Sequence, residues 1–335
     1  MTDTRAANPS ITERARSIEV GGPVVAVHFL NDLAGFVLGE ETLVLAASNG
    51  ETRRVDVHAG AILTSAADET RIITGGDDGR VLATGANGKS AVLATDAKRR
   101  WIDQVAQGPD NAVAWSAGKQ VFVKTAKGEN RSFDAPSSPG GLVFAPKGLR
   151  LAVSHYNGTS LWFPNVANAK PEFLEWKGSH LGITFSPDGR FLVTAMQEPT
   201  LHGWRLVDGR HMRMAGYAAK VRSTSWSNGG KWLATSGADQ LVLWPFQGKE
   251  GPMGKQPKLL APADKGVVAV ACHPAQDIVA VGYEHGLVLL VRIDDGAEIL
   301  ASKPEGVAVS AMTWNRAGTM LAFGREDGRA AILRL

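Results

Sequence analysis

Residues 83–90, ATGANGKS, have the spelling of a phosphate-binding loop, with a small residue, four residues of any kind and then Gly-Lys-Ser. Such a loop holds phosphate where a buried strand leads into a helix, because the helix N-terminal amides point at the anion. Here the segment joins two strand-like runs, GRVLATG and SAVLATD, and no helical pattern follows. We therefore expect a turn between strands rather than a nucleotide site.

Adjacent reactive side chains also fail as catalytic pairs. Cys272 and His273 are neighbours in the sequence, and neighbouring residues of a strand point to opposite faces, so they cannot act as nucleophile and base. The same geometry separates the carboxylates at 77–78 and 294–295, which have the character of turn residues. Because Cys272 is the one cysteine, the chain can form neither an internal disulfide nor a cysteine zinc cluster.

Histidine is the remaining candidate metal ligand. Four histidines are expected in loops on one rim of the molecule, but they belong to different repeat units: His58, His155, His180 and His285. A zinc site needs its ligands about 2 Å from one ion in a tetrahedral array, which dispersed loops do not provide. We therefore expect no catalytic residues, no cofactor and no obligate metal.

These residues must be positioned by a repeated unit of short strands. Residues 181–204, LGITFSPDGRFLVTAMQEPTLHGW, contain a strand, the turn Ser-Pro-Asp-Gly, a second strand, a polar tip and a third strand. Weaker copies recur about every 40 residues, the period of a propeller blade. The units start near Val24, Ala61, Trp101, Gly140, Leu181, Val221, Gly266 and Val307.

The repeat predicts an all-β fold, a closed propeller of four-stranded antiparallel blades. Eight blades are expected, and seven is the alternative because the third unit lacks the usual turn residues. The last unit has three strands, so a lone strand at 14–20 is expected to supply its fourth and join the two ends. Residues 1–13 are expected to form a flexible tail, and residues 14–335 a single domain.

At this point the chain resembles the WD-repeat β-propellers, over residues 14–335. The resemblance rests on the turns at 144–148, 185–189 and 314–318, on aspartates between the second and third strands, and on third-strand tryptophans. The Gly-His pair of the family is nearly absent, and no unit ends in Trp-Asp. The resemblance implies that turn aspartates hold each blade and that tryptophans pack between blades, which gives a structural set: Asp78, Trp162, Asp188, Trp204, Asp239, Trp244 and Asp327.

Aromatic and basic residues suggest a binding surface on the rim formed by the second-to-third-strand loops and the loops between units. All three tyrosines fall there, and Trp101 follows a Lys-Arg-Arg run. Tyr, Trp and Arg are enriched at binding hot spots, although a tyrosine can also cap a strand with its ring buried. The predicted partner-binding residues are Arg99, Arg100, Trp101, Tyr156, His180, Tyr217, Lys220, Tyr283 and Arg325.

We therefore predict a non-catalytic scaffold that binds a partner protein or peptide, with basic stretches at 89–131 and 205–258 favouring an acidic one. One alternative is an enzyme or small-ligand or metal binder that uses Glu284, His285, Glu326 and His180 at a central channel. A second is a nucleic-acid-associated propeller, disfavoured because no basic strip is interleaved with aromatics. The start lacks a secretion signal and no apolar run could span a bilayer, so we expect a cytoplasmic protein without a membrane partner.

Overall fold

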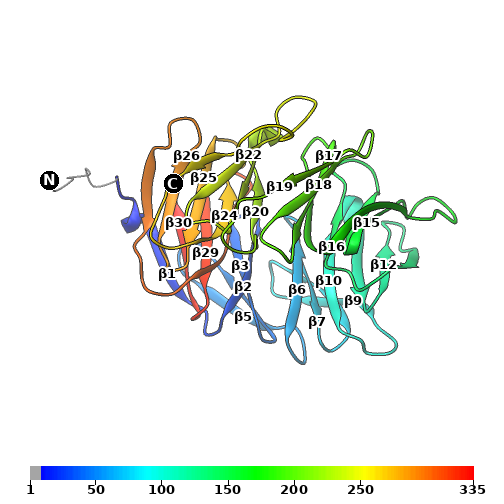
Figure 1. Cartoon of the computed structure of the whole chain (residues 1–335). Coiled ribbons are helices and arrows are strands. Elements are labelled where there is room, and N and C mark those ends of the chain that lie inside the picture. Colours follow the sequence, from blue (N-terminus) through cyan, green and yellow to red (C-terminus); the bar gives the residue numbers. More distant parts are fainter. Residues whose placement is uncertain (1–8) are drawn as a thin grey trace.

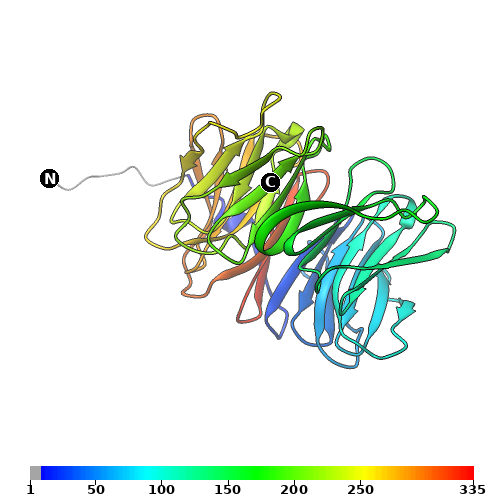
Figure 2. The same cartoon turned by 45° about the vertical axis from the view of Figure 1, so that its right-hand side comes forward.

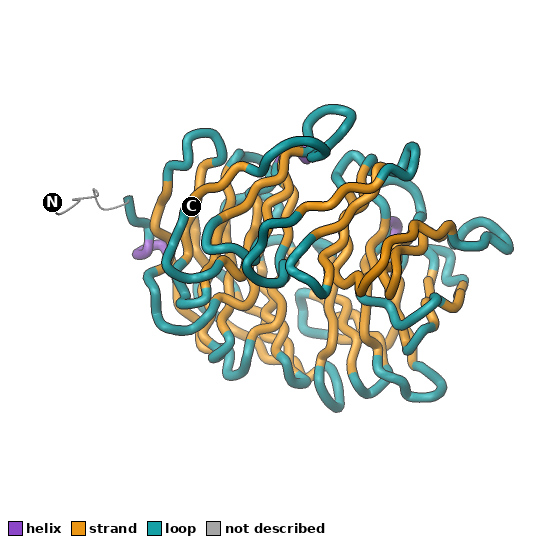
Figure 3. Tube along the Cα trace, viewed as in Figure 1, coloured by secondary structure: helices purple, strands orange, loops and turns teal. Residues whose placement is uncertain are grey.

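The computed structural model describes residues 9–335, which fold almost entirely into β-strands (Figure 3). Short runs rich in Val, Ile, Leu and Thr form the strands, and Gly, Pro, Asp and Asn form the turns between them. Three 3-10 helices of three residues each occur in this range: η1 (Thr12–Arg14), η2 (Pro109–Asn111) and η3 (Asn228–Gly230). None of the helices described is long and apolar enough to cross a membrane.

The sheets of the first three sequence units have four antiparallel strands each, ordered as in the chain. The first consists of β2 (Val24–Leu30), β3 (Leu33–Leu38), β4 (Thr42–Ala46) and β5 (Thr52–Asp56). The second consists of β6 (Ile62–Ala67), β7 (Arg71–Gly76), β8 (Arg80–Gly85) and β9 (Ser90–Thr95). The third consists of β10 (Ile102–Gln107), β11 (Val113–Ala117), β12 (Gln120–Lys124) and β13 (Asn130–Asp134).

The last three units form four-stranded sheets as well. The sixth contains β20 (Thr224–Trp226), β21 (Trp232–Thr235), β22 (Leu241–Pro245) and β23 (Lys258–Leu260). The seventh contains β24 (Val267–Cys272), β25 (Ile278–Tyr283), β26 (Val288–Arg292) and β27 (Glu298–Ser302). The eighth contains β28 (Val309–Trp314), β29 (Met320–Arg325), β30 (Arg329–Arg334) and β1 (Ala15–Glu19).

The fourth and fifth units share one six-stranded sheet, so the described residues form seven sheets, the number of the alternative, and the expectation of eight separate blades is wrong. This sheet contains β14 (Gly141–Phe144), β15 (Leu151–Trp162), β16 (Glu172–Phe185), β17 (Phe191–Met196), β18 (Leu201–Arg205) and β19 (His211–Met214).

The long strands β15 and β16 cause this merger. Each serves two positions, since β16 pairs with β15 through its first half and with β17 through its second half. Asn157 and Gly158 in β15 and Gly178 in β16 have positive φ, so the chain changes direction inside these strands instead of leaving them for a loop. The irregularity therefore lies in units four and five, whereas the third unit forms an ordinary four-stranded sheet.

The N-terminal strand pairs with the C-terminal unit, as expected. β1 lies antiparallel to β30 along its whole length, from Ala15 opposite Leu333 to Glu19 opposite Arg329. Of the predicted tail 1–13, residues 1–8 lie outside the described residues. Residues 9–11 are attached to the neighbouring sheet, because Ile11 N–H donates to Leu300 O at 2.9 Å and Leu300 N–H donates to Pro9 O at 2.8 Å.

The sheets follow one another in chain order from blue to red (Figure 1), and the first sheet lies beside the last (Figure 2). Their apolar faces pack against each other, so most of the buried core lies between neighbouring sheets. The tryptophans expected between blades do lie there: Trp204 is 2% exposed and packs in one cluster with Leu161 and Leu174 of the preceding unit. Trp162 and Trp244 are buried in clusters that also contain residues of the preceding unit, such as Val121 beside Trp162 and Phe191 beside Trp244.

Candidate functional site

Two kinds of loop meet at one rim of the propeller. Loops joining the second and third strands of a unit are hydrogen-bonded to loops that lead from one unit to the next. Tyr156 N–H, for example, donates to Ser137 Oγ at 2.9 Å, and Lys220 Nζ donates to Gln197 Oε1 at 2.8 Å. We call this edge the connecting rim, and the edge formed by the other loops the opposite rim. All of the predicted partner-binding residues belong to the connecting rim or to the strand ends beneath it.

A buried triad fixes the second unit at this rim. His58 lies between Thr74 and Asp78, with Nε2 2.9 Å from Thr74 Oγ1 and Nδ1 3.0 Å from Asp78 Oδ1. Asp78 also accepts from Ala59 N–H at 3.1 Å and from Arg80 Nε at 2.8 Å. The loop before the unit, its second strand and its turn are thereby tied together, which is a structural role for Asp78 and His58.

A tyrosine takes the place of histidine in the sixth unit. Trp244 Nε1 donates to Tyr217 Oη at 2.6 Å, Tyr217 Oη lies 2.8 Å from Thr235 Oγ1, and Thr235 donates to the carbonyl of Val242 at 3.2 Å. All of these side chains are buried, and burial raises the pKa of Tyr217 to about 12. The tyrosine therefore stays neutral and acts as a relay between tryptophan and threonine.

The fifth unit repeats the arrangement with His180. Its Nδ1 lies 2.7 Å from Thr194 Oγ1, and its Nε2 lies 2.9 Å from the carbonyl of Trp176. Sequence reasoning missed these networks, although a signal was present. Thr74, Thr194 and Thr235 each occupy the fourth position of a second strand, in RIITGG, FLVTAM and WLATSG.

The carboxylate of Asp78 predicts a pH dependence of stability. Burial acts to raise its pKa, but the hydrogen bonds from Arg80, Ala59 and His58 together outweigh burial and hold the pKa well below its usual range. An aspartate whose pKa is lower in the folded state stabilises the protein at pH values above its pKa in the unfolded chain, which is about 4. This stabilisation is lost as the pH falls below that value. We expect the free energy of unfolding to fall below about pH 4, with a shallower fall in Asp78→Asn, measured by urea denaturation across the acid range. Equal slopes in both proteins would contradict this role.

The other turn aspartates make more local contacts. Asp188 accepts from Ser186 Oγ at 2.6 Å and from Arg190 N–H at 3.0 Å, and Asp327 accepts from Arg329 N–H at 3.1 Å. Asp239 holds its loop through the backbone, since its carbonyl accepts from Ala263 N–H at 2.9 Å. The contacts of Asp188 and Asp327 order single turns, whereas the contacts of Asp78 and Asp239 connect separate loops.

Burial removes four predicted partner-binding side chains from the surface. His180, Tyr217, Tyr283 and Arg325 are 1%, 9%, 0% and 3% exposed. Tyr283 Oη donates to the carbonyl of Ala261 at 2.5 Å, and Arg325 Nη2 donates to Ser302 Oγ at 2.8 Å. Tyr283 Oη and Arg325 Nη2 thus bind the protein itself, and all four side chains lack the exposed area that an anchor for a partner needs.

The exposed members of the predicted set come from units two to four on the connecting rim. Trp101 and Tyr156 are 61% and 59% exposed, and Arg99 is exposed beside Trp101. Arg100 is instead tied to Asp96, with 2.6 Å between Nη2 and Oδ1, and it also reaches Gln120 of the third unit. Arg100 therefore holds the loop that presents Trp101, and Lys220 lies apart in the fifth-to-sixth-unit loop.

Three further cations join this surface. Lys98 and Lys119 are exposed in loops and Lys177 is exposed on the strand β16. Together with Arg99 they take part in none of the ion pairs found between residues 9 and 335. We call the resulting surface the aromatic–basic patch, which consists of Lys98, Arg99, Trp101, Lys119, Tyr156 and Lys177. Two exposed rings among four free cations suit an acidic segment of a partner.

The metal and nucleophile candidates are placed apart. No group of three or more His, Cys, Asp or Glu in the described part of the chain could hold a metal ion. His155 bonds Ser160 at 2.9 Å, and His285 lies 3.7 Å from Asp264. Burial raises the pKa of the Cys272 thiol to about 12, so it stays protonated and unreactive at neutral pH.

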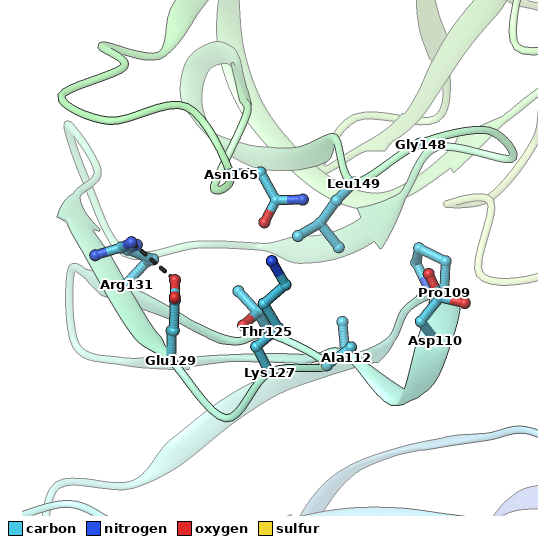
Figure 4. Close-up of a pocket in the computed structure, with 11 residues that line it drawn as sticks. Pro109, Asp110, Ala112, Thr125, Lys127, Glu129, Arg131, Gly148, Leu149 and Asn165 are labelled. Atoms are coloured by element: carbon cyan, nitrogen blue, oxygen red, sulfur yellow. Dashed lines mark hydrogen bonds and ion pairs between the residues drawn. The ribbon is translucent and has the colours of Figure 1, made fainter.

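A hollow on the opposite rim lies between the third and fourth units (Figure 4). It has a volume of about 660 Å³ and is bordered by the β12–β13 turn and by the loop that contains Asn165. Glu129 and Arg131 pair at its edge at 2.8 Å, and Lys127 points toward its middle. Its lining has a hydroxyl, an amide and charged groups but no histidine or cysteine, so it can hold a small polar group and offers no nucleophile with a base.

Two family models match separate parts of the chain. The WD domain, G-beta repeat, matches residues 211–244, and the Anaphase-promoting complex subunit 4 WD40 domain matches residues 270–335. The first covers strands β19 to β22, including the partners Tyr217, Thr235 and Trp244. The chain is a WD-repeat β-propeller. The comparison specifies no individual member of that family.

The chain is also similar to curated relatives over part of its length and to a solved structure over nearly all of it. Telomerase protein component 1 of Rattus norvegicus and that of Mus musculus are each 28% identical over 200 residues, which is 58% of this chain and 7% of the relative. The chain therefore matches only a small part of those proteins. The crystal structure of the computationally designed Ika8 protein superposes with a TM-score of 0.76 and covers 95% of this chain and 99% of its own. At 16% identity that likeness concerns the fold alone.

Proposed function

We propose that this WD-repeat propeller is a non-catalytic scaffold that binds an acidic segment of a partner protein on the aromatic–basic patch. The observation that carries the proposal is the pair of exposed rings, Trp101 and Tyr156, among four cations without an ion-pair partner. WD40 propellers are typical protein-interaction scaffolds, so the family points the same way.

The aromatic–basic patch contains residues that can contact a partner, and neighbouring residues hold its two rings in position. Arg100 and Asp96 hold the loop of Trp101 in place, and Ser137 holds the backbone of β15 at Tyr156. Loops fixed by a rigid scaffold lose little conformational entropy when a partner binds. Burial of the two rings would then supply most of the affinity, while the cations would attract an acidic partner and raise its association rate.

Replacing both rings tests the proposal. We expect the Trp101→Ala, Tyr156→Ala double variant to lose partner capture by about 30-fold or more, since single hot-spot aromatics contribute about 2 kcal/mol or more each. The measurement is affinity capture from a lysate with quantitative mass spectrometry, followed by titration of the captured protein. Phe163→Ala is the matched control, because Phe163 is 44% exposed on the opposite rim. Equal capture by wild type and the double variant would show that the patch is the wrong surface.

Nucleic acid is the second candidate for the same cations. Retention on DNA or RNA that falls steeply with salt would favour it over a protein partner. The basic stretch 205–258 gives it little support, because Arg205 and Arg210 are paired with Asp208 and Glu250. The central-channel group of the enzyme alternative also loses His180, whose ring nitrogens are both occupied.

The relatives suggest where such a scaffold could act. By name, the rat and mouse relatives are protein components of telomerase, and a part in a larger assembly suits a scaffold. This chain matches 7% of each, so membership of any given assembly is a proposal. The cytoplasmic location expected from the sequence also stays a prediction.

A further inference from the structure

A cavity lined by both polar and apolar side chains lies at the centre of the propeller, apart from the aromatic–basic patch. The first strands of units one and two, β2 and β6, face β16 and the segment that enters β20 across it. The cavity has a volume of about 560 Å³, within the range of small-molecule sites. Units distant in the sequence therefore line one cavity.

The wall of this cavity is rich in hydroxyl groups. Four hydroxyl side chains line it, and one imidazole lies among them: Ser65, Thr184, Ser223, Thr224 and His28. His28 Nε2 lies 2.9 Å from Ser65 Oγ, and Thr184 Oγ1 accepts from Trp226 Nε1 at 2.9 Å. Burial lowers the pKa of His28 to about 4, so the ring is neutral at physiological pH and can accept or donate a hydrogen bond.

One cation stands at the edge of the polar wall. Arg222 is the one lining residue that is charged at neutral pH, and its backbone N–H is held by Ser236 Oγ at 3.1 Å. None of the ion pairs in the described chain uses its guanidinium. A guanidinium offers a planar fork of donors that suits a carboxylate or phosphate.

The cavity has a route to solvent beside this arginine. Arg222 also lines a neighbouring hollow of about 310 Å³, with Val25, Val268 and Glu326. Val25 and Val268 each occupy the bulge at the second residue of a first strand. Bulges re-aim side chains, so the first strands narrow this entrance with apolar groups and leave Arg222 where entrance and cavity meet.

We propose that the central cavity binds a small polyhydroxylated anion, such as a sugar acid or a sugar phosphate. Arg222 pairs with the anionic group, and the hydroxyl groups of the wall together with His28 bind the hydroxyls of the ligand. This site is independent of the protein-binding surface proposed above.

Calorimetric titration of the full chain with glucuronate, glucose 6-phosphate and glucose tests the site. We expect one of the two anions to bind, and the uncharged sugar to bind at least about 10-fold more weakly, because hydrogen bonds to charged groups contribute about 1.5–3 kcal/mol. The stronger of the two anions identifies whether carboxylate or phosphate is preferred. Absence of binding by all three at millimolar concentration, or equal binding of glucose and both anions, would overturn the proposal.

Single substitutions in the cavity show which side chains contribute to the affinity for the ligand. Arg222→Gln should lower the affinity for the anion by about 10- to 100-fold and leave the affinity for the uncharged sugar unchanged. Thr224→Val should lower the affinity for both the anion and the uncharged sugar. Arg213→Gln is the matched control, since Arg213 is exposed on β19 and does not line the cavity. Unchanged anion affinity in Arg222→Gln, with the thermal midpoint of the variant equal to wild type, would refute the assignment.

Discussion

The Tyr217→Ala variant is expected to lose about 3–5 kcal/mol of free energy of unfolding, the usual cost of removing a buried aromatic ring. Tyr217 is 9% exposed and packs in a cluster with Met214 and Leu233. Its hydroxyl is also the acceptor for Trp244 Nε1 and a partner of Thr235. Removal of the ring therefore leaves a cavity together with a buried indole N–H that has no acceptor.

Two further variants separate the effect of the lost ring from the effect of the lost hydroxyl. Tyr217→Phe keeps the ring and removes the hydroxyl, so we expect a loss of about 1–3 kcal/mol. Tyr156→Ala removes a tyrosine that is 59% exposed and should change stability by less than about 0.5 kcal/mol. Urea denaturation of all three proteins measures these differences. If Tyr217→Ala unfolded like wild type and lost partner capture, Tyr217 would be an anchor for the partner rather than part of the core.

Deletion of residues 1–19 is expected to destabilise the eighth unit severely. The deletion removes β1, all of whose residues pair with β30, and it removes Ile18, which is 6% exposed. Burial of such a side chain alone contributes about 1.5–3 kcal/mol. The uncovered edge of β30 can then pair with another chain, so we expect a lower thermal midpoint together with oligomers or aggregates in light scattering.

Deletion of residues 1–14 is the control for this experiment. It keeps β1. Of the described residues, it removes the backbone hydrogen bonds of residues 9–11 with β27, worth about 0.5–1.5 kcal/mol each, together with the half-buried Ile11 and the 3-10 helix η1 beside β27 and β30. We expect a small loss of stability and a monodisperse protein. Equal destabilisation by both deletions would mean that the β27 contacts, rather than β1, secure the N-terminal segment.

The pattern of short strands and turns was sufficient to predict the class of fold. Strands such as VVAVHF and RIITGG alternate with Asp-Gly and Pro-containing turns at one period, and local propensity and turn chemistry act within a few residues. The pairing of the N-terminal strand with the last unit was also predictable, because that unit has one strand too few. The shared sheet of units four and five was not, since Asn157 and Gly158 had the spelling of an ordinary turn.

The candidate site was predicted less well, and for one reason. Tyr156 and Tyr283 each occupy the sixth position of a second strand, yet Tyr156 is 59% exposed and Tyr283 fully buried. A residue at a strand end is covered or open according to the neighbouring unit, which lies about 40 residues away in the chain. Sequence position therefore identified the rim, while the packing of adjacent sheets decided which rings reach solvent.

The sequence by itself determined the repeat, the strand order within each unit and the absence of a disulfide, because these follow from local spacing and composition. Only the tertiary structure decided which histidines and tyrosines bond a threonine, which cations stay unpaired and which strands face the central cavity. Arg222 illustrates the difference: its neighbours in the cavity include His28 and Ser65, more than 150 residues earlier in the chain. Such contacts depend on the relative placement of whole sheets, and no local pattern encodes that placement.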